Sequence, residues 1–419
     1  MLGQEVKLII NKLNPKADGI ANYDDMNIYV AKTLVGDEVI AKIYEKRDGY
    51  AKAELLEIVK ASPMRIKPPC RYYGKCGGCN MQHFNQTSYL DFKQKISDDI
   101  ATDLTKGSVK AASIFETGYN DRRKLNLKIS SESELKIGFF KELSHQVVDI
   151  TECLIANNRI NKLIPHIRVL LNEIKIKRIL KEITIYDLGH SFDIILNTSE
   201  YLTKADKESI KEFCLQNNIA RFAQSIDQEH IIFDNMNAYL ELKDMQIFPP
   251  INYFMQASYK VENRIVDAIK EHLDKNDDVL DLFAGLGTYS ISIYGLVKNI
   301  TAYEGSKNMA NVTKSMVAEN QLDRLNVFYR DLFRRPVSAK DLSKFDKVII
   351  NPPRDGAKNQ IIQISKSKIR KIIMVSCNPV TFKRDSKILI KAGFKMTYLQ
   401  ALDQFYANTH LELIAIFEN

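Results

Sequence analysis

One cysteine stands in a segment suited to nucleophilic chemistry. Cys377 lies in Val375-Ser-Cys-Asn-Pro379, at the end of the apolar run Ile372-Ile-Met-Val375. The run has the length and β-branched content of a buried strand, and the proline that follows cannot continue a central strand. The thiol is therefore expected at the carboxyl end of a parallel strand, where open α/β sheets bind ligands. Lys383 and Arg384 follow closely, and nearby positive charge would favour the thiolate. A lone cysteine is otherwise more often a small buried apolar residue.

A second group of cysteines has the spacing of metal ligands. Cys70, Cys76 and Cys79 form a C-x5-C-x2-C pattern, and Cys153 is the only nearby fourth candidate. Two glycines between the second and third cysteines would let backbone amides approach sulfur ligands. The pattern predicts a metal site. The spacing by itself is compatible with zinc and with an iron–sulfur cluster.

A glycine-rich turn marks a third site. The strand-like run Val279-Leu-Asp-Leu-Phe283 leads into Ala284-Gly-Leu-Gly-Thr288 and a helical segment, which is typical of a nucleotide-binding opening. Glu304 ends the next predicted strand, at the offset from Gly285 where a carboxylate can bind ribose hydroxyls. The turn lacks the third glycine of a dinucleotide site and the Lys-Ser/Thr of a P-loop.

Polar residues also end the strands that follow. Asp331 ends a third predicted strand, Asn351 follows a fourth, and Cys377 follows a fifth. Because the carboxyl ends of parallel strands share one edge of a sheet, these residues are expected to line a single ligand site.

The elements that must position these residues fall into three predicted domains. Residues 1–62 alternate apolar and polar positions between turn signals, which predicts a small antiparallel β-barrel. Residues 63–250 mix strands and helices and are expected to form a central α+β domain. Residues 251–419 carry the strand, turn and helix pattern of an α/β domain. In the barrel, Lys42, Lys46, Arg47 and Lys52 are candidate RNA contacts, although a solvated charged face is the commoner role of such residues. At the head of a central strand, Arg122, Arg123 and Lys124 are candidate phosphate contacts.

Composition sets the broad class. The chain has 419 residues and a formal net charge of +8, from 60 Lys+Arg against 52 Asp+Glu, a balance compatible with a nucleic-acid partner. The N-terminal segment has no apolar run typical of a signal peptide, and no run approaches membrane-spanning length. A cytoplasmic protein without membrane association or a stable protein partner is expected.

With these motifs assembled, the chain resembles the RNA uracil-C5-methyltransferase family, most closely its TRAM-domain, iron–sulfur-containing 23S rRNA branch. The resemblance spans the whole chain in order. It is carried by the N-terminal barrel, the cysteine pattern, Phe254-Met-Gln256, Asp281-Leu-Phe-Ala-Gly-Leu-Gly287, Asn351-Pro-Pro-Arg354, Val375-Ser-Cys-Asn-Pro379 and His410-Leu-Glu412.

The resemblance implies a fold and two cofactors. It implies a multidomain protein with an N-terminal TRAM or OB-like β-barrel, a central α+β domain with a cysteine-ligated cluster, and a C-terminal Rossmann-like S-adenosylmethionine methyltransferase domain. The cluster would be a [4Fe–4S] on Cys70, Cys76, Cys79 and Cys153. The residues implied to bind S-adenosylmethionine, together with those of the glycine turn, are Gln256, Phe283, Gly285, Thr288, Glu304, Asp331 and Asn351. The family usually has Asp where this chain has Asn351.

The resemblance also implies a mechanism. Cys377 would add to C6 of a uracil so that C5 can attack the methyl group, and Glu412 would then remove the C5 proton. The target base must be flipped or already unpaired to be reached. The expected substrate is 23S rRNA. The alternatives are transfer RNA, which the barrel and the cysteine pattern disfavour, a non-catalytic RNA-binding factor with a methylase fold, and an RNA cytosine-C5-methyltransferase.

Overall fold

The computed structural model describes residues 2–131, 134–142 and 144–419. The chain divides into two compact units. The first contains residues 1–96, 140–148 and 407–409, and the second contains the remainder. The described residues form three large sheets and one two-stranded sheet.

A six-stranded sheet forms the N-terminal barrel. Its strand order is β1 (Glu5–Ile9), β5 (Glu38–Arg47), β6 (Tyr50–Lys60), β4 (Met26–Val30), β3 (Gly19–Tyr23) and β2 (Lys12–Leu13). Residues of β1 alternate between exposed and buried, which is the pattern expected of a strand with one face on a core. The prediction of a purely antiparallel barrel was wrong for one pair, because β4 and β6 run parallel.

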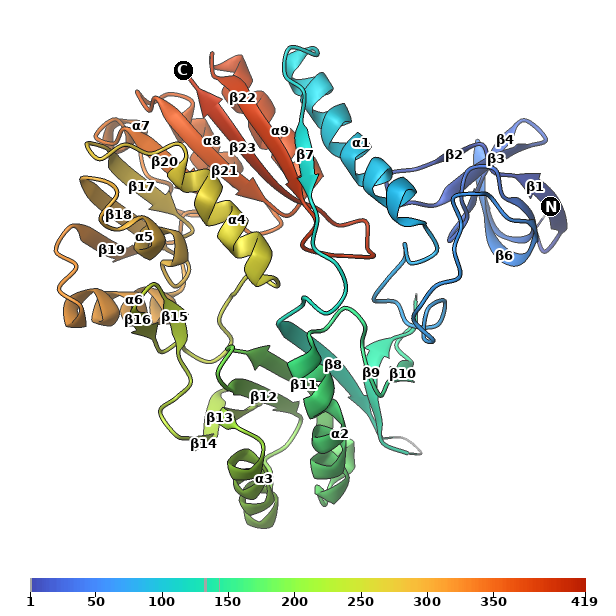
Figure 1. Cartoon of the computed structure of the whole chain (residues 1–419), viewed down its shortest axis with the longest axis horizontal. Helices are drawn as coiled ribbons and strands as arrows, with labels where there is room; N and C mark the ends of the chain where they lie inside the picture. Colours follow the sequence, from blue (N-terminus) through green and yellow to red (C-terminus); the bar gives the residue numbers. More distant parts are fainter. Residues whose placement is uncertain (1, 132–133, 143) are drawn as a thin grey trace. The chain divides into compact units, whose positions relative to one another are not determined.

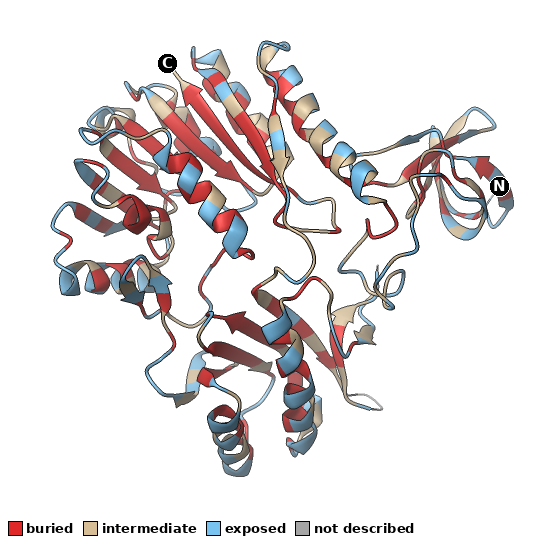
Figure 2. Ribbon diagram, viewed as in Figure 1, coloured by how far each residue is buried: buried red, intermediate tan, exposed pale blue. Residues whose placement is uncertain are grey.

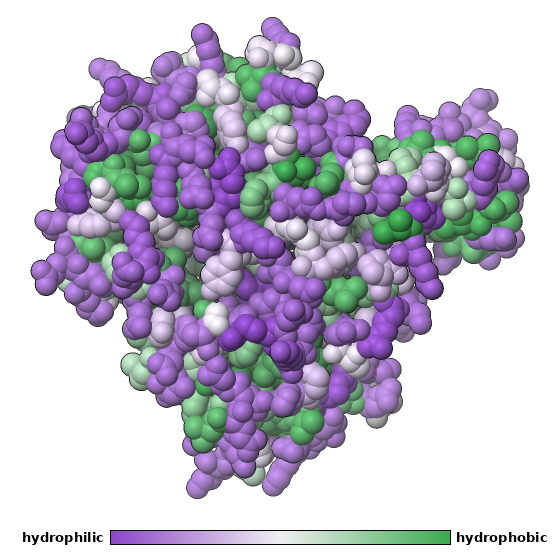
Figure 3. All heavy atoms as spheres, viewed as in Figure 1, coloured by the Kyte–Doolittle hydropathy of each residue, from purple (hydrophilic) through white to green (hydrophobic). Residues whose placement is uncertain are grey.

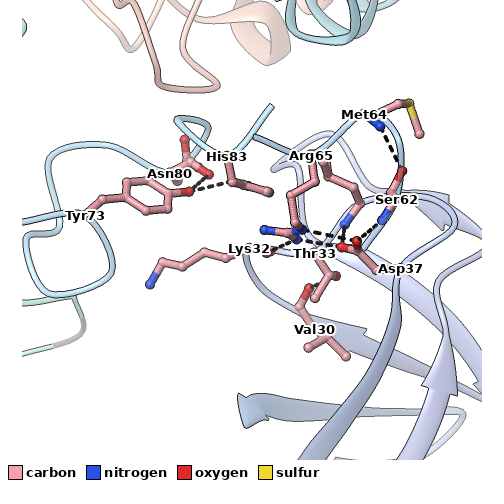
Figure 4. Close-up of polar contacts among 11 residues, drawn as sticks. Val30, Lys32, Thr33, Asp37, Ser62, Met64, Arg65, Tyr73, Asn80 and His83 are labelled. Atoms are coloured by element: carbon pink, nitrogen blue, oxygen red, sulfur yellow. Dashed lines mark hydrogen bonds and ion pairs between the residues drawn. The ribbon is translucent and has the colours of Figure 1, made fainter. Parts of the chain in front are cut away.

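A buried ion pair fixes the end of this barrel (Figure 4). The Asp37 carboxylate accepts hydrogen bonds from Ser62 N at 2.8 Å and from Arg65 Nη2 at 2.6 Å. Burial opposes the charge, but these hydrogen bonds outweigh it and lower the pKa of Asp37. The residues after β6 are thereby held against the loop before β5.

A seven-stranded sheet forms the central part of the chain. Its order is β10 (Val147–Asp149), β9 (Lys136–Phe140), β8 (Lys124–Ser130), β11 (Leu180–Asp187), β12 (Phe192–Thr198), β13 (Ile219–Ser225) and β14 (Glu229–Asp234). The helical segments that accompany it are α2 (Asn158–Glu173), η1 (Lys177–Ile179) and α3 (Lys204–Gln216). Thr203 and Asp206 form a capping box at the start of α3, which explains why the helix begins there.

The C-terminal sheet has eight strands (Figure 1). Its order is β19 (Leu325–Tyr329), β18 (Asn299–Glu304), β17 (Asp278–Leu282), β20 (Lys347–Ile350), β21 (Lys371–Ser376), β23 (Glu412–Glu418), β22 (Lys395–Leu402) and β7 (Ala112–Phe115). Strands β17 to β21 pair with one another in parallel, whereas β23 is antiparallel to both of its neighbours, β21 and β22. Strand β7 comes from the predicted central range, yet it pairs with β22.

The chain order reverses between β17 and β20, and a ligand site is expected at their carboxyl ends. Helices lie on both faces of this sheet, and its strands β17, β20, β21 and β23 are almost wholly buried (Figures 1 and 2). The helices of this part are α4 (Tyr259–Lys270), α5 (Thr288–Ile293), α6 (Lys307–Glu319), α7 (Ala339–Leu342), α8 (Lys358–Ile364) and α9 (Pro379–Lys391). The remaining elements are α1 (Gln86–Thr105) and the hairpin of β15 (Leu240–Leu242) with β16 (Met245–Ile247).

Helix α4 buries Val261, Ile265 and Ile269, which recur every four residues and so lie on one face of the helix. Within the part of the chain that the structure describes, no helix combines the length and apolar character needed to cross a membrane.

Candidate active site

Cys377 lies between β21 and α9, at the carboxyl end of the strand. Pro379 is the first residue of α9, a position where its missing N–H costs nothing. The Asn378 side chain caps the helix by accepting a hydrogen bond from Val380 N at 3.0 Å. Strand end, thiol and helix start therefore follow one another directly, and the thiol is left partly exposed.

The cation that interacts with this thiol is Arg354. The sequence-based prediction assigned that role to Lys383 and Arg384 and was wrong. Lys383 pairs with Asp103 at 2.8 Å, and Arg384 pairs with the neighbouring Asp385.

The thiol is not activated in the free protein. Burial and then the Glu412 carboxylate raise the pKa of Cys377, and Arg354 only partly offsets them. The group accordingly carries its proton at neutral pH.

Hydrogen bonds join the loop that carries Arg354 to the loop that carries Cys377. The first of these loops follows β20 and begins at Asn351. The Arg354 carbonyl oxygen accepts hydrogen bonds from Asn378 Nδ2 at 3.0 Å and from Thr381 Oγ1 at 3.1 Å. The predicted polar ends of neighbouring strands are thus joined by hydrogen bonds at this edge of the sheet.

Glu412 opens β23 and is only 2% exposed. The antiparallel register pairs Ser376 of β21 with Leu413 of β23. The next position along the pair of strands therefore sets Cys377 opposite Glu412. Burial raises the pKa of Glu412 to about 8, although a hydrogen bond from Gln404 and the charge of Arg354 lower it. A carboxyl group with that pKa exists in both protonation states near neutral pH, which suits a general base.

The glycine turn approaches Glu304. Gly285 and Gly287 have φ of 59° and 75°, conformations that favour glycine. Gly285 N donates to Glu304 Oε2 at 2.8 Å, and Ser306 N donates to Oε1 at 2.6 Å. A carboxylate oxygen can accept more than one hydrogen bond, so Glu304 keeps capacity for ribose hydroxyls.

Gln256 and Asn351 meet at one hydroxyl group. Gln256 Nε2 donates to Tyr289 Oη at 3.2 Å, and Asn351 Nδ2 donates to the same oxygen at 3.1 Å. Among the described atoms, Gln256 Oε1 is buried and receives no hydrogen bond. A buried acceptor of this kind is costly unless a ligand supplies a donor, so the site fits a bound cofactor.

The other predicted cofactor residues lie along the same edge. Phe283 has a φ of 62°, and its ring lies 5.4 Å from that of Phe333, centroid to centroid. Asp331 lies just beyond β19 and accepts a hydrogen bond from Phe333 N at 3.0 Å. Thr288 is the first residue of α5. No ligand contact is assigned to these residues by the geometry alone.

The loop of residues 70–79, which carries Cys70, Cys76 and Cys79, has features that fit a thiolate-bound group. Gly78 N points at Cys76 Sγ from 3.4 Å. A Cβ added to Gly77 would lie 3.1 Å from the Phe140 carbonyl oxygen, which explains the glycine. Cys70, Cys76 and Cys79 belong to the first unit, whereas Cys153 belongs to the second. Over the described residues, no three or more His, Cys, Asp or Glu side chains are gathered as a metal-ion site.

The loop of residues 70–79 is anchored to the segment after it (Figure 4). Tyr73 Oη lies 2.8 Å from the Asn80 carbonyl oxygen and 2.6 Å from His83 Nδ1. Burial lowers the pKa of His83 to about 3, so its ring is neutral. These contacts bracket Cys76 and Cys79 on both sides in the chain.

Comparison with known proteins identifies the family. The family model of the tRNA (Uracil-5-)-methyltransferases matches residues 87–418, and that of the TRAM domain matches residues 1–56. The chain belongs to the RNA uracil-C5-methyltransferase family. Its N-terminal barrel is the TRAM domain.

Relatives of this family cover the whole chain. A 23S rRNA (uracil(1939)-C(5))-methyltransferase RlmD from Shewanella amazonensis is 30% identical over 100% of this chain and 96% of its own length. The protein of the same name from Vibrio vulnificus is 28% identical over 98% of this chain and 96% of its own. The tRNA (uracil-54, C5)-methyltransferase of Pyrococcus abyssi, solved with S-adenosyl-L-homocysteine, has the same fold. Its TM-score is 0.79 at 23% identity, over 98% of this chain and 99% of that chain.

Sequence reasoning missed several residues of this methyltransferase site. Arg354 was part of a recognised motif but was given no role, and Tyr289 carries no local signal at all. Arg123, expected to contact phosphate, is instead buried and pairs with Glu262 at 2.7 Å. Only the folded chain brings these side chains next to the residues that the motifs contain.

Proposed function

We propose that the protein methylates C5 of a uracil in RNA, with S-adenosylmethionine as the methyl donor, Cys377 as the nucleophile and Glu412 as the base. The observation that carries this proposal is the pairing of β21 with β23, which sets a thiol and a buried carboxyl group at adjacent positions. The glycine turn after β17 lies at the same edge of the sheet.

The reaction follows from these groups. Deprotonated Cys377 adds to C6 of uracil, and the Arg354 cation stabilises the thiolate needed for this step. S-adenosylmethionine, when bound, supplies an electrophilic methyl group. Once C5 carries the methyl group, Glu412 takes the remaining C5 proton, the C5–C6 double bond re-forms and the sulfur leaves. We assign cofactor binding to Gln256, Phe283, Gly285, Thr288, Glu304, Asp331 and Asn351.

The proposed RNA is 23S rRNA. This choice is supported by the relatives named as 23S rRNA methyltransferases, whose alignments cover almost all of this chain and almost all of their own length. Transfer RNA is the alternative, supported by the fold of the archaeal enzyme. Mapping 5-methyluridine in ribosomal and transfer RNA from cells that lack the gene distinguishes the two. Loss from 23S rRNA alone is expected. An RNA substrate also implies a cytoplasmic location.

The TRAM barrel is proposed to contact this RNA, and we retain the division into residues 1–62, 63–250 and 251–419. The barrel surface combines hydrophilic with apolar side chains (Figure 3). Lys42 and Lys46 are exposed, and Tyr44 between them is 53% exposed. Lysines provide phosphate contacts and an aromatic ring can stack on a base. Arg47 and Lys52, also predicted as contacts, both pair with Glu45.

We also propose a [4Fe–4S] cluster on Cys70, Cys76, Cys79 and Cys153. The amide of Gly78 directed at the Cys76 sulfur supports ligation by thiolates.

Trapping the intermediate tests the mechanism. Cys377→Ala should bind RNA but form no covalent adduct. Glu412→Gln should still transfer the methyl group but fail to eliminate, so that methylated RNA stays bound through Cys377. On a denaturing gel with radiolabelled cofactor, this variant should give a labelled protein–RNA band that the double variant lacks. A Cys377→Ala protein that makes 5-methyluridine refutes the mechanism. RNA binding with no methylation by the wild type would favour a non-catalytic binding factor.

A further inference from the structure

Gln404 lies beside the proposed base and was assigned no role above. It follows β22 and is 6% exposed. The residue before it is held on both sides: Asp403 N donates to the Phe115 carbonyl oxygen at 2.9 Å, and Thr117 Oγ1 donates to the Asp403 carbonyl oxygen at 2.6 Å. The end of strand β7 at Phe115 therefore fixes the backbone position from which the Gln404 side chain extends.

The side-chain amide of Gln404 bridges two segments that are distant in sequence. Ala257 N donates to Gln404 Oε1 at 3.0 Å, and Gln404 Nε2 donates to Glu412 Oε2 at 3.1 Å. A main-chain N–H can only donate, so the amide oxygen must face Ala257 and the amide nitrogen must face Glu412. The orientation of this glutamine is thus set by chemistry.

The bridge gives the two oxygens of Glu412 different roles. Oε2 must remain an acceptor, because the group opposite it is a donor. A carboxylic acid can still accept at its carbonyl oxygen while its other oxygen carries the proton. A proton that reaches Glu412 therefore belongs on Oε1.

The other end of the bridge is also rigid. Arg123 Nε donates to the Gln256 carbonyl oxygen at 2.7 Å, and Arg123 N donates to the Ala257 carbonyl oxygen at 2.9 Å. The guanidinium group is buried and paired with Glu262. Gln404 accordingly links the segment that carries a proposed cofactor residue to the proposed base.

On the basis of the methyl-transfer function above, we propose that Gln404 is a positioning residue that engages Oε2 of Glu412 and reserves Oε1 for the C5 proton. In the elimination step, the C5–H bond breaks and its electron pair forms the C5–C6 double bond. The C6–S bond breaks and its pair returns to the Cys377 sulfur, while the proton goes to Glu412 Oε1. The hydrogen bond from Gln404 to Glu412 acts on this step, since attack and methyl transfer do not require Glu412 to accept that proton.

The test compares Gln404→Met with Gln400→Met, using the full-length protein and an RNA that contains [5-²H]uridine. Gln400 is a buried glutamine of β22 whose amide contacts Arg264 and the Ser113 carbonyl oxygen, so its variant controls for loss of a buried amide. Gln404→Met should accumulate about ten-fold more labelled covalent adduct than wild type, which corresponds to loss of one hydrogen bond to a charged group. Its isotope effect on product formation should rise, while the rate of adduct formation stays within two-fold. Gln400→Met should change neither the adduct level nor the isotope effect.

A second variant keeps the size of the side chain. Gln404→Glu replaces the amide that donates to Glu412 Oε2 by a second carboxyl group, and a proton held between the two groups no longer leaves Oε1 as the reserved acceptor, so the adduct should again accumulate. An adduct level and isotope effect equal to wild type in both variants would overturn the inference. So would equal slowing of adduct formation and release. If the wild type itself forms no adduct and no 5-methyluridine, it is the proposed function that fails.

Discussion

At the scale of the residue, the site contains two groups whose pKa differs from the usual value. Burial raises the pKa of both Cys377 and Glu412, and each also interacts with Arg354. Neither group is in its reactive form in most free molecules at neutral pH.

The raised pKa of Glu412 has a consequence for stability. The native state holds a proton on Glu412 up to about pH 8, whereas an unfolded glutamic acid releases it near its model value of 4.5. The contribution of this group to the free energy of unfolding therefore falls as the pH rises between these values. Glu412→Gln removes the effect. We expect it to match wild type at pH 4.5 and to be more stable by roughly 2–4 kcal/mol at pH 9.

Thermal unfolding at pH 4.5, 7 and 9 measures this difference. Glu319→Gln, at the exposed end of α6, is the matched control and should follow wild type at every pH. A constant difference between Glu412→Gln and wild type across the pH range would contradict the expected burial of this carboxyl group.

Asn351 provides a second test at this scale. Its side chain lies 3.1 Å from Tyr289 Oη, a hydroxyl that can donate as readily as it accepts. Asn351→Asp is therefore expected to fold normally and to add a negative charge near the proposed methyl donor. S-adenosylmethionine carries a positive sulfonium and S-adenosylhomocysteine does not, so the variant should gain several-fold in affinity for the first relative to the second. Calorimetry with both ligands measures the ratio, and an unchanged ratio would place Asn351 away from the sulfonium.

At the scale of the element, the loop after β20 and the start of α9 act together. Gly356 has a φ of 72°, and a Cβ at this position would lie 2.9 Å from Thr381 Cβ and 2.6 Å from Asp385 Oδ2. Ala357 N donates to the same Asp385 oxygen at 2.8 Å. The loop that carries Arg354 can reach the thiol because a glycine lets it pack directly on α9.

Gly356→Ala should separate these two elements. Positive φ alone costs an alanine about 1 kcal/mol, and the clash with α9 should add ~1–3 kcal/mol and displace Arg354. Gly295→Ala is the control, because its φ is 90° but a Cβ there meets nothing within 4 Å. We expect Gly356→Ala to lose both stability and methylation, and Gly295→Ala to lose about 1 kcal/mol of stability with methylation intact. Equal effects of the two substitutions on methylation would argue against the packing of this loop as the cause.

At the scale of the whole molecule, the four cysteines proposed as cluster ligands come from two compact units of the chain. Metal binding by ligands that lie far apart in the sequence stabilises the folded state, because such a site does not exist in the unfolded chain.

Purified, anaerobically handled protein should be brown and contain iron and acid-labile sulfide. Cys153→Ser is expected to lower the iron content and to increase proteolysis of residues 63–85, which the cluster would hold. Cys214→Ser is the control, since Cys214 is buried in α3 and burial raises the pKa of its thiol to about 12. Stoichiometric zinc without iron or sulfide in wild-type protein would refute the iron–sulfur proposal.

The sequence alone determined the parts of this protein that depend on local order along the chain. Alternating apolar residues predicted the barrel, and apolar runs followed by polar residues located the carboxyl ends of β17, β18, β20 and β21. These features can be read because a strand, its turn and the residue after it are consecutive. Family motifs then indicated the chemistry of Cys377 and Glu412.

Tertiary structure decided the neighbours of these residues. Two cations close to Cys377 in sequence are directed to other partners, whereas Arg354 comes from the neighbouring strand's loop. Arg123 is buried although it stands in a basic run, because Glu262 on α4 neutralises it. The bridge from Ala257 through Gln404 to Glu412 joins three separate segments. Charge pairing and desolvation depend on distance in space, and proximity in sequence constrains that distance only within one turn or strand.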